Sequence, residues 1–248
     1  MRGLESLKKS FNNISKQPFL FVWGSLLFLF MLILFTFAAI GLFLSYFLFL
    51  SIFGQEMNLE SISTLSVIGV IVVIWLFFIN AINAALAMTY KAGPNRKKMT
   101  LTKFYSYALD RAPTVFGIML LREFFWLVLV GPFLALFVYF LADYEFMDML
   151  MLLYGIFTTF ALHMLFTPSF ILAGGFGTNM FGSLKMGFDF LRKKHVFFIG
   201  VYILFAIVWL LNFLPFIQIA SIFFLFPLVY SAMIIMIKNT IKVNEDEE

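Results

Sequence analysis

Five strongly polar side chains interrupt segments that are otherwise apolar enough to cross a bilayer. Polar and ionisable groups inside a membrane are costly, and they often mark ion sites, proton relays or paired contacts between helices. These side chains could therefore relay protons, bind an ion or tie helices together. They are Asn80, Asn83, Arg122, Glu123 and His163.

The five side chains are expected at one depth in the membrane. If the span that carries Arg122 enters the lipid near Pro113, the rise of about 1.5 Å per residue places Arg122 about 13 Å from that entry point. His163 and the two asparagines lie at similar distances before the C-terminal ends of their own spans, and these ends are expected on the same side of the membrane as Pro113. In a hydrocarbon core of about 30 Å, these depths predict one polar cluster in the inner leaflet.

Arg122 and Glu123 are adjacent, and adjacent helical residues point about 100° apart. We therefore expect that the two charges cannot simply neutralise each other within their helix. Glu123 could pair with His163 or an asparagine, whereas Arg122 could lie over Trp126 or reach the inner headgroups. A working site and a purely structural contact between helices both stay open.

Enzymatic chemistry is not predicted. The chain has no cysteine and two histidines, and it contains no HExxH motif, nucleophile elbow or spaced carboxylate pair within a span. The "GGFG" at 174–177 lacks the flanking strand of a phosphate-binding loop. We predict no catalytic residue, no cofactor and no metal site.

The elements that must position the polar cluster are membrane helices. Apolar residues make up 63% of the 248 residues and charged residues 12%, whereas a soluble domain has about 25% charged residues. Apolar runs of about twenty residues predict an all-α, polytopic membrane protein with six transmembrane helices in one domain, 1–248. The predicted spans are 19–50, 65–90, 115–141, 149–172, 196–211 and 217–237.

The basic residues predict how the spans are oriented. Of the 17 lysines and arginines, all except Arg122 fall in four clusters that share one side of a six-span arrangement. Basic segments tend to stay cytoplasmic, so we expect a cell-membrane protein with both termini in the cytoplasm. The net charge of +4 then reflects topology and anionic lipid headgroups, and no nucleic-acid partner is predicted. The expected headgroup contacts are Lys8, Lys16, Lys103, Arg111, Lys185 and Lys193.

The basic segments also indicate an internal repeat. "SLKKSFNNISKQPFLF" from Ser6 and "SLKMGFDFLRKKHVFF" from Ser183 share six of sixteen positions, and "LTKFYSYALDRAPTVF" from Leu101 is a weaker third copy. Leu7, Phe11 and Ile14 are spaced as one helical face. We predict three repeats, each an interfacial amphipathic helix followed by two spans. The units are approximately 1–90, 91–172 and 173–242, followed by an acidic tail at 243–248.

The run "TPSFILAGGFGTNMFGSLKMGFDFLRKKHVFFIGVYIL" from Thr167 carries a family resemblance. Its proline, glycine-containing turn, "SLKxGF" and basic patch resemble a loose group of polytopic prokaryotic membrane proteins. The group is similar to the membrane domain of glycerophosphodiester phosphodiesterases, and its activity is unassigned. The resemblance implies a fold and a membrane location, and it transfers no catalytic residue.

Two functions remain. The first is an integral membrane scaffold or assembly factor that acts on lipids or other membrane proteins through its polar cavity and its cytoplasmic-face helices. The alternative is a transporter of small solutes or ions that uses Glu123 and His163. Apparently parallel repeats differ from the inverted halves of many transporters, and most spans lack a polar stripe. The sequence therefore favours the scaffold.

Overall fold

The computed structural model describes residues 3–52, 62–91, 100–137, 145–211 and 214–240. Within these ranges the chain is all-α, and six of its helices are long and apolar enough to cross a membrane. The predicted all-α fold and six spans are confirmed, and the chain is a multi-pass membrane protein by this criterion. The elements are α1 (Gly3–Lys16), α2 (Pro18–Ile52), α3 (Ile62–Lys91), α4 (Leu101–Leu136), α5 (Glu145–Phe176), α6 (Met180–Leu211), α7 (Pro215–Ala220), the π-helical turn η3 (Ser221–Leu225) and α8 (Phe226–Thr240).

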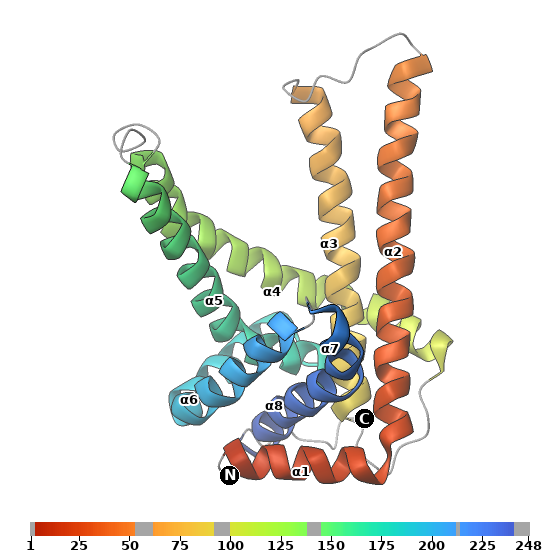
Figure 1. The fold of residues 1–248 in the computed structure, drawn as a ribbon, viewed down its shortest axis with the longest axis vertical. Helices are drawn as coiled ribbons and strands as arrows, with labels where there is room; N and C mark the ends of the chain where they lie inside the picture. The colour runs from red at the N-terminus through yellow and green to blue at the C-terminus, as the bar shows by residue number, and fades with distance from the viewer. Residues whose placement is uncertain (1–2, 53–61, 92–99, 138–144, 212–213, 241–248) are drawn as a thin grey trace.

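Two hairpins of long helices diverge from a shared base. α2 and α3 stand side by side, and α4 and α5 form a second hairpin that leans away from the first (Figure 1). α6 and α8 pack together below the opening between the hairpins, and α1 lies across the base beside α8. Both hairpins, together with α6 and α8, contribute residues to the cavity described below.

The segments predicted as interfacial helices join their spans in different ways. α1 ends at Lys16, and Pro18 begins α2 after a one-residue break, because proline disfavours helical geometry in the residue before it. In α6 the helix bends at Lys194, whose φ of −138° and ψ of 19° are not helical. α4 instead runs through Pro113 as one helix. The expectation of a separate interfacial helix in the middle unit is therefore wrong.

α1 faces the protein with serines as well as with apolar residues. Ser6 and Ser10 are buried, and the Ser10 hydroxyl donates to the Leu228 carbonyl of α8 at 2.7 Å. Of the predicted apolar face, Leu7 and Ile14 pack against the core, whereas Phe11 is 61% exposed. Small serines let α1 approach α8 closely, and this approach turns Phe11 outward.

Small residues bring α5 against α3. The four alanines that follow and flank the two asparagines of α3 are all buried, and Gly174 lies against one of them. A Cβ atom at Gly174 would stand 2.7 Å from the Cα of Ala84, so only glycine permits this approach. The Tyr107 hydroxyl of α4 donates to the Gly174 carbonyl at 2.6 Å. Three helices are thus locked together at one point.

The glycine-containing turn between α5 and α6 is held by an arginine. Gly177 has a φ of 73°, a left-handed conformation that strains residues with a Cβ atom. Its carbonyl accepts a hydrogen bond from Nη1 of Arg111 at 2.7 Å. The Asn179 side chain then accepts from the Gly182 amide at 2.8 Å and caps the start of α6.

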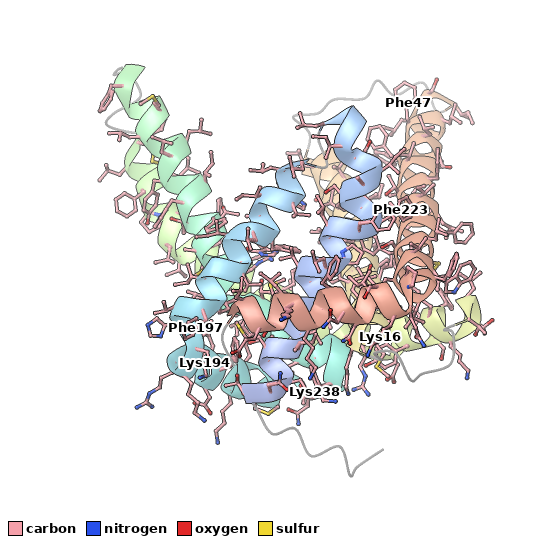
Figure 2. All side chains as sticks on the ribbon, turned by 60° about the horizontal axis from the view of Figure 1, so that its bottom comes forward. Lys16, Phe47, Lys194, Phe197, Phe223 and Lys238 are labelled. Atoms are coloured by element: carbon pink, nitrogen blue, oxygen red, sulfur yellow. The ribbon has the colours of Figure 1, made fainter. Side chains whose placement is uncertain are left out.

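The basic residues gather toward one end of the molecule. Figure 2 shows Lys16, Lys194 and Lys238 at the end where α1 lies, whereas Phe47 lies toward the far end of α2. This separation is the one that the basic clusters of the sequence predict. Which side of a membrane this end occupies stays a prediction.

Candidate functional site

A large cavity lies between the two hairpins and α6 to α8. Its volume is about 1230 Å³, and residues of every element from α2 to α8 line it. Pockets for small molecules usually measure about 300–1,000 Å³. The space therefore exceeds what a compact metabolite would fill.

Four of the five predicted polar residues line this one cavity. Asn80 and Asn83 come from α3, Arg122 from α4 and His163 from α5. Glu123 does not line it, and its side chain is 47% exposed. The structure thus brings the three neutral residues and Arg122 to one cavity, and it leaves Glu123 outside the lining, where its carboxylate bonds to Arg122.

His163 bonds to a residue that the sequence did not single out. Its Nδ1 lies 2.6 Å from the Tyr202 hydroxyl of α6 and 3.4 Å from the Thr167 hydroxyl. Thr167 also donates to the His163 backbone carbonyl at 2.7 Å. Tyr202 is the closer partner, and only the packing of α6 on α5 shows it, because the two residues are 39 positions apart. The predicted pairing of His163 with Glu123 does not form.

Arg122 and Glu123 bond to each other, which overturns the expectation that adjacent residues could not pair. The Arg122 Nε donates to Oε1 of Glu123 at 3.0 Å, and its Nη2 contacts the same oxygen. Both side chains are long enough to bend across the angle between their Cα–Cβ bonds. The guanidinium lies 5.6 Å from the ring centroid of Phe170, whereas the indole of Trp126 donates to Thr159 at 2.8 Å.

The two asparagines differ in how their amides are satisfied. The Asn80 Nδ2 donates to the Leu76 carbonyl of its own helix at 2.7 Å and contacts the Met119 sulfur at 3.0 Å. Asn83 lines the cavity without a hydrogen bond to any other residue in the part of the chain that the structure describes. Its amide is therefore free to bind an occupant of the cavity.

A second polar group borders the cavity where α2 meets η3. The Ser25 hydroxyl lies 2.7 Å from the Tyr90 hydroxyl and 3.2 Å from the Ile222 carbonyl. The Phe226 amide bonds to Ser221, and Pro227 has no amide hydrogen. Ser25 thus satisfies a carbonyl that the π-helical turn leaves without its usual donor. Its small hydroxyl carried no sequence signal of this role.

The remaining wall of the cavity is mostly apolar and partly open to the surroundings. Exposed residues on the outer parts of α4, α5 and α6 line it: Leu134, Leu152, Ile156 and Trp209 are 48%, 63%, 57% and 51% exposed. The polar lining residues of the hairpins lie closer to the end where α1 lies. One end of the cavity therefore carries Arg122, His163 and the two asparagines, and the other is mostly apolar and open, with the exposed Gln218 of α7 as a polar exception.

The residues predicted to contact lipid headgroups lie in two environments. Lys8, Lys16, Lys103, Lys185 and Lys193 are exposed, as such contacts require. The Arg111 side chain is 29% exposed, and it lies 5.6 Å from the Tyr107 ring centroid as well as bonding to Gly177. Arg111 thus serves the turn between α5 and α6, and its headgroup contact stays a prediction.

Within the described ranges, no group of three or more histidine, cysteine, aspartate or glutamate residues could hold a metal ion. Comparison with protein families, with curated proteins and with solved structures finds no match to this chain. The resemblance to the phosphodiesterase membrane domain therefore stays a prediction.

Proposed function

We propose that this protein is an integral membrane scaffold or assembly factor that binds a membrane lipid in the cavity between its hairpins. The cavity carries this proposal, because its polar end and its open apolar end match the two parts of a lipid molecule. Its volume of about 1230 Å³ suits an acyl lipid better than a small solute. Other membrane proteins are the second expected partner.

The repeat gives this scaffold its framework. In the alignment of the basic segments, Gln17 corresponds to Lys194, and Pro18 corresponds to Pro113. The break between α1 and α2 falls at Gln17, and the bend in α6 falls at Lys194. A helix interruption at equivalent positions supports the equivalence of the first and third units, whereas the middle unit rests on the sequence alignment alone. In this proposal those segments lie along the cytoplasmic surface, where exposed lysines meet anionic headgroups.

The geometry favours the scaffold over the transporter. The transporter hypothesis uses Glu123 and His163 as proton or ion sites, and of these two residues only His163 lines the cavity. Glu123 is bonded to Arg122 instead. A flux assay in sealed vesicles tests this choice: pH-coupled solute flux that is lost in Glu123→Gln and in His163→Ala would overturn the scaffold proposal.

Substitution of two glycines by phenylalanine tests whether lipid occupies the cavity. Gly155 of α5 lines the cavity, and Gly200 of α6 does not. Apart from the adjacent residues and backbone of its own helix, a Cβ atom at either position meets no described atom within 4 Å, so we expect both helices to tolerate a larger side chain. We expect Gly155→Phe to reduce the lipid that copurifies with the detergent-washed protein, measured by native mass spectrometry, and Gly200→Phe to leave it unchanged. Equal lipid content in both variants would contradict the proposal.

A further inference from the structure

We infer that the lipid bound in the cavity is anionic, with its acidic headgroup on Arg122 and its acyl chains along the apolar wall of α4, α5 and α6. This inference rests on the proposed function and adds the class of lipid and its direction. The acidic group is a phosphodiester or a carboxylate, since a guanidinium binds both through paired hydrogen bonds.

Charge supports an anionic headgroup. Among the described residues that line the cavity, Arg122 is the one ionised side chain, and the other polar groups are neutral amides, hydroxyls, indoles and an imidazole. The free Asn83 amide offers a further donor to a headgroup oxygen. His163 is already bonded to Tyr202 at its Nδ1, which fixes its ring beside the same space. A zwitterionic headgroup would also bring a cationic group, which meets no carboxylate among the described residues of the lining, since Glu123 bonds to Arg122 from outside it.

The direction of the lipid follows from the order of residues along α4 and α5. On α4, Arg122 is followed toward the outer end by Val130 and Leu134, and on α5, His163 is preceded by Ile156 and Leu152. The acyl chains would therefore run from the polar end toward the open end and leave between helices into the bilayer. Trp209 borders this exit, and it is half exposed.

Glu123 acts as the competitor of the headgroup in this arrangement. While the cavity is without lipid, its carboxylate neutralises Arg122 and spares the cost of an unpaired charge away from water. An incoming acidic headgroup takes over the guanidinium, and Glu123, being exposed, turns away from α4. Removal of either charge should therefore change lipid affinity in opposite directions.

The test measures lipid affinity of the full chain in nonionic detergent by native mass spectrometry. The probes are dioleoyl phosphatidylglycerol, dioleoyl phosphatidylcholine with the same chains, oleate and inorganic phosphate. We expect the wild type to prefer phosphatidylglycerol, and Arg122→Gln to lower that affinity about tenfold, the loss of one charge-assisted contact. Arg122→Lys should retain the preference, and Glu123→Gln should increase it. The matched control is Arg192→Gln, because Arg192 is an exposed cation outside the cavity.

Each outcome decides the inference. If oleate binds as tightly as phosphatidylglycerol, the inference is supported and the acidic group can be a carboxylate. If inorganic phosphate displaces the lipid, the inference is overturned, because the acyl chains would then be unnecessary for binding. Equal binding of the two phospholipids, weaker binding in Glu123→Gln, or an equal loss in Arg192→Gln also overturns it. If the wild type binds both phospholipids equally and Gly155→Phe excludes both, the proposed function survives and this inference alone fails. If Gly155→Phe leaves lipid binding intact, both fail.

Discussion

Because α5 crosses α3 closely at Gly174, we expect a larger residue at this position to lower the stability of the protein. A Cβ atom at this position would lie 2.7 Å from the Cα, 3.1 Å from the Cβ and 3.3 Å from the carbonyl oxygen of Ala84. Carbon atoms pack best at about 3.5–4.0 Å, and the nearest of these atoms belongs to the backbone, which cannot rotate away. Gly174→Ala must therefore push the helices apart, and overpacking of this kind costs about 1–3 kcal/mol.

A second glycine isolates this steric cost. Gly155→Ala places a Cβ atom in open space on the same helix, and both substitutions gain helix propensity of up to about 1 kcal/mol. The difference in unfolding free energy between the two variants is then about 1–3 kcal/mol in favour of Gly155→Ala. Unfolding by graded SDS in mixed micelles, followed by far-UV circular dichroism, measures it. If Gly174→Ala is as stable as Gly155→Ala, the close approach of α3 and α5 is incorrect.

Three further predictions concern the turn, the histidine and the topology. Gly177→Ala should destabilise the protein by about 1–2 kcal/mol, because a left-handed conformation strains alanine; the same SDS titration measures this, and an unchanged midpoint would contradict the φ of 73°. Tyr202→Phe should cost about 1–3 kcal/mol by removing the hydrogen-bond partner of His163; a double-mutant cycle with His163→Ala should show coupling, and additive losses would speak against the bond. Because the chain contains no cysteine, Ser15→Cys and Ile52→Cys introduce single thiols, and impermeant maleimide should label Ser15→Cys only from the cytoplasmic side and Ile52→Cys only from the opposite side. Labelling of both from one side would refute the six-span topology.

The junctions between the basic segments and the spans differ among the three predicted repeats. The pattern of Lys16 and Lys193 predicted equivalent junctions between a basic segment and a span, and the helices break or bend one residue later. The same pattern predicted a separate helix before Pro113, and α4 is continuous there. An interior proline removes one helical hydrogen bond and kinks or breaks many helices, whereas membrane helices can continue through it. The sequence therefore could not distinguish a break from a continuous helix.

The sequence by itself determined that lipid surrounds most of the chain, that the spans are helical, and which polar residues were candidates for the site. Lipid is the only solvent that suits 63% apolar residues, and a backbone in lipid satisfies its hydrogen bonds within helices. Polar residues in such spans are few, so Asn80, Asn83, Arg122 and His163 could be singled out as candidates for one cluster. Their similar distances from the span ends indicated a shared depth.

Only the tertiary structure decided which side chains face the cavity and which bond to one another. The spans are apolar on nearly all sides, so periodicity does not reveal how each helix is rotated about its axis. Rotation of α4 turns Arg122 toward the cavity and Glu123 away from it. The packing of α6 on α5 brings Tyr202 to His163, and the packing of α2 on α3 brings Ser25 to Tyr90. These contacts join residues 39 and 65 positions apart, and they depend on how the helices cross, which small residues such as Gly174 control.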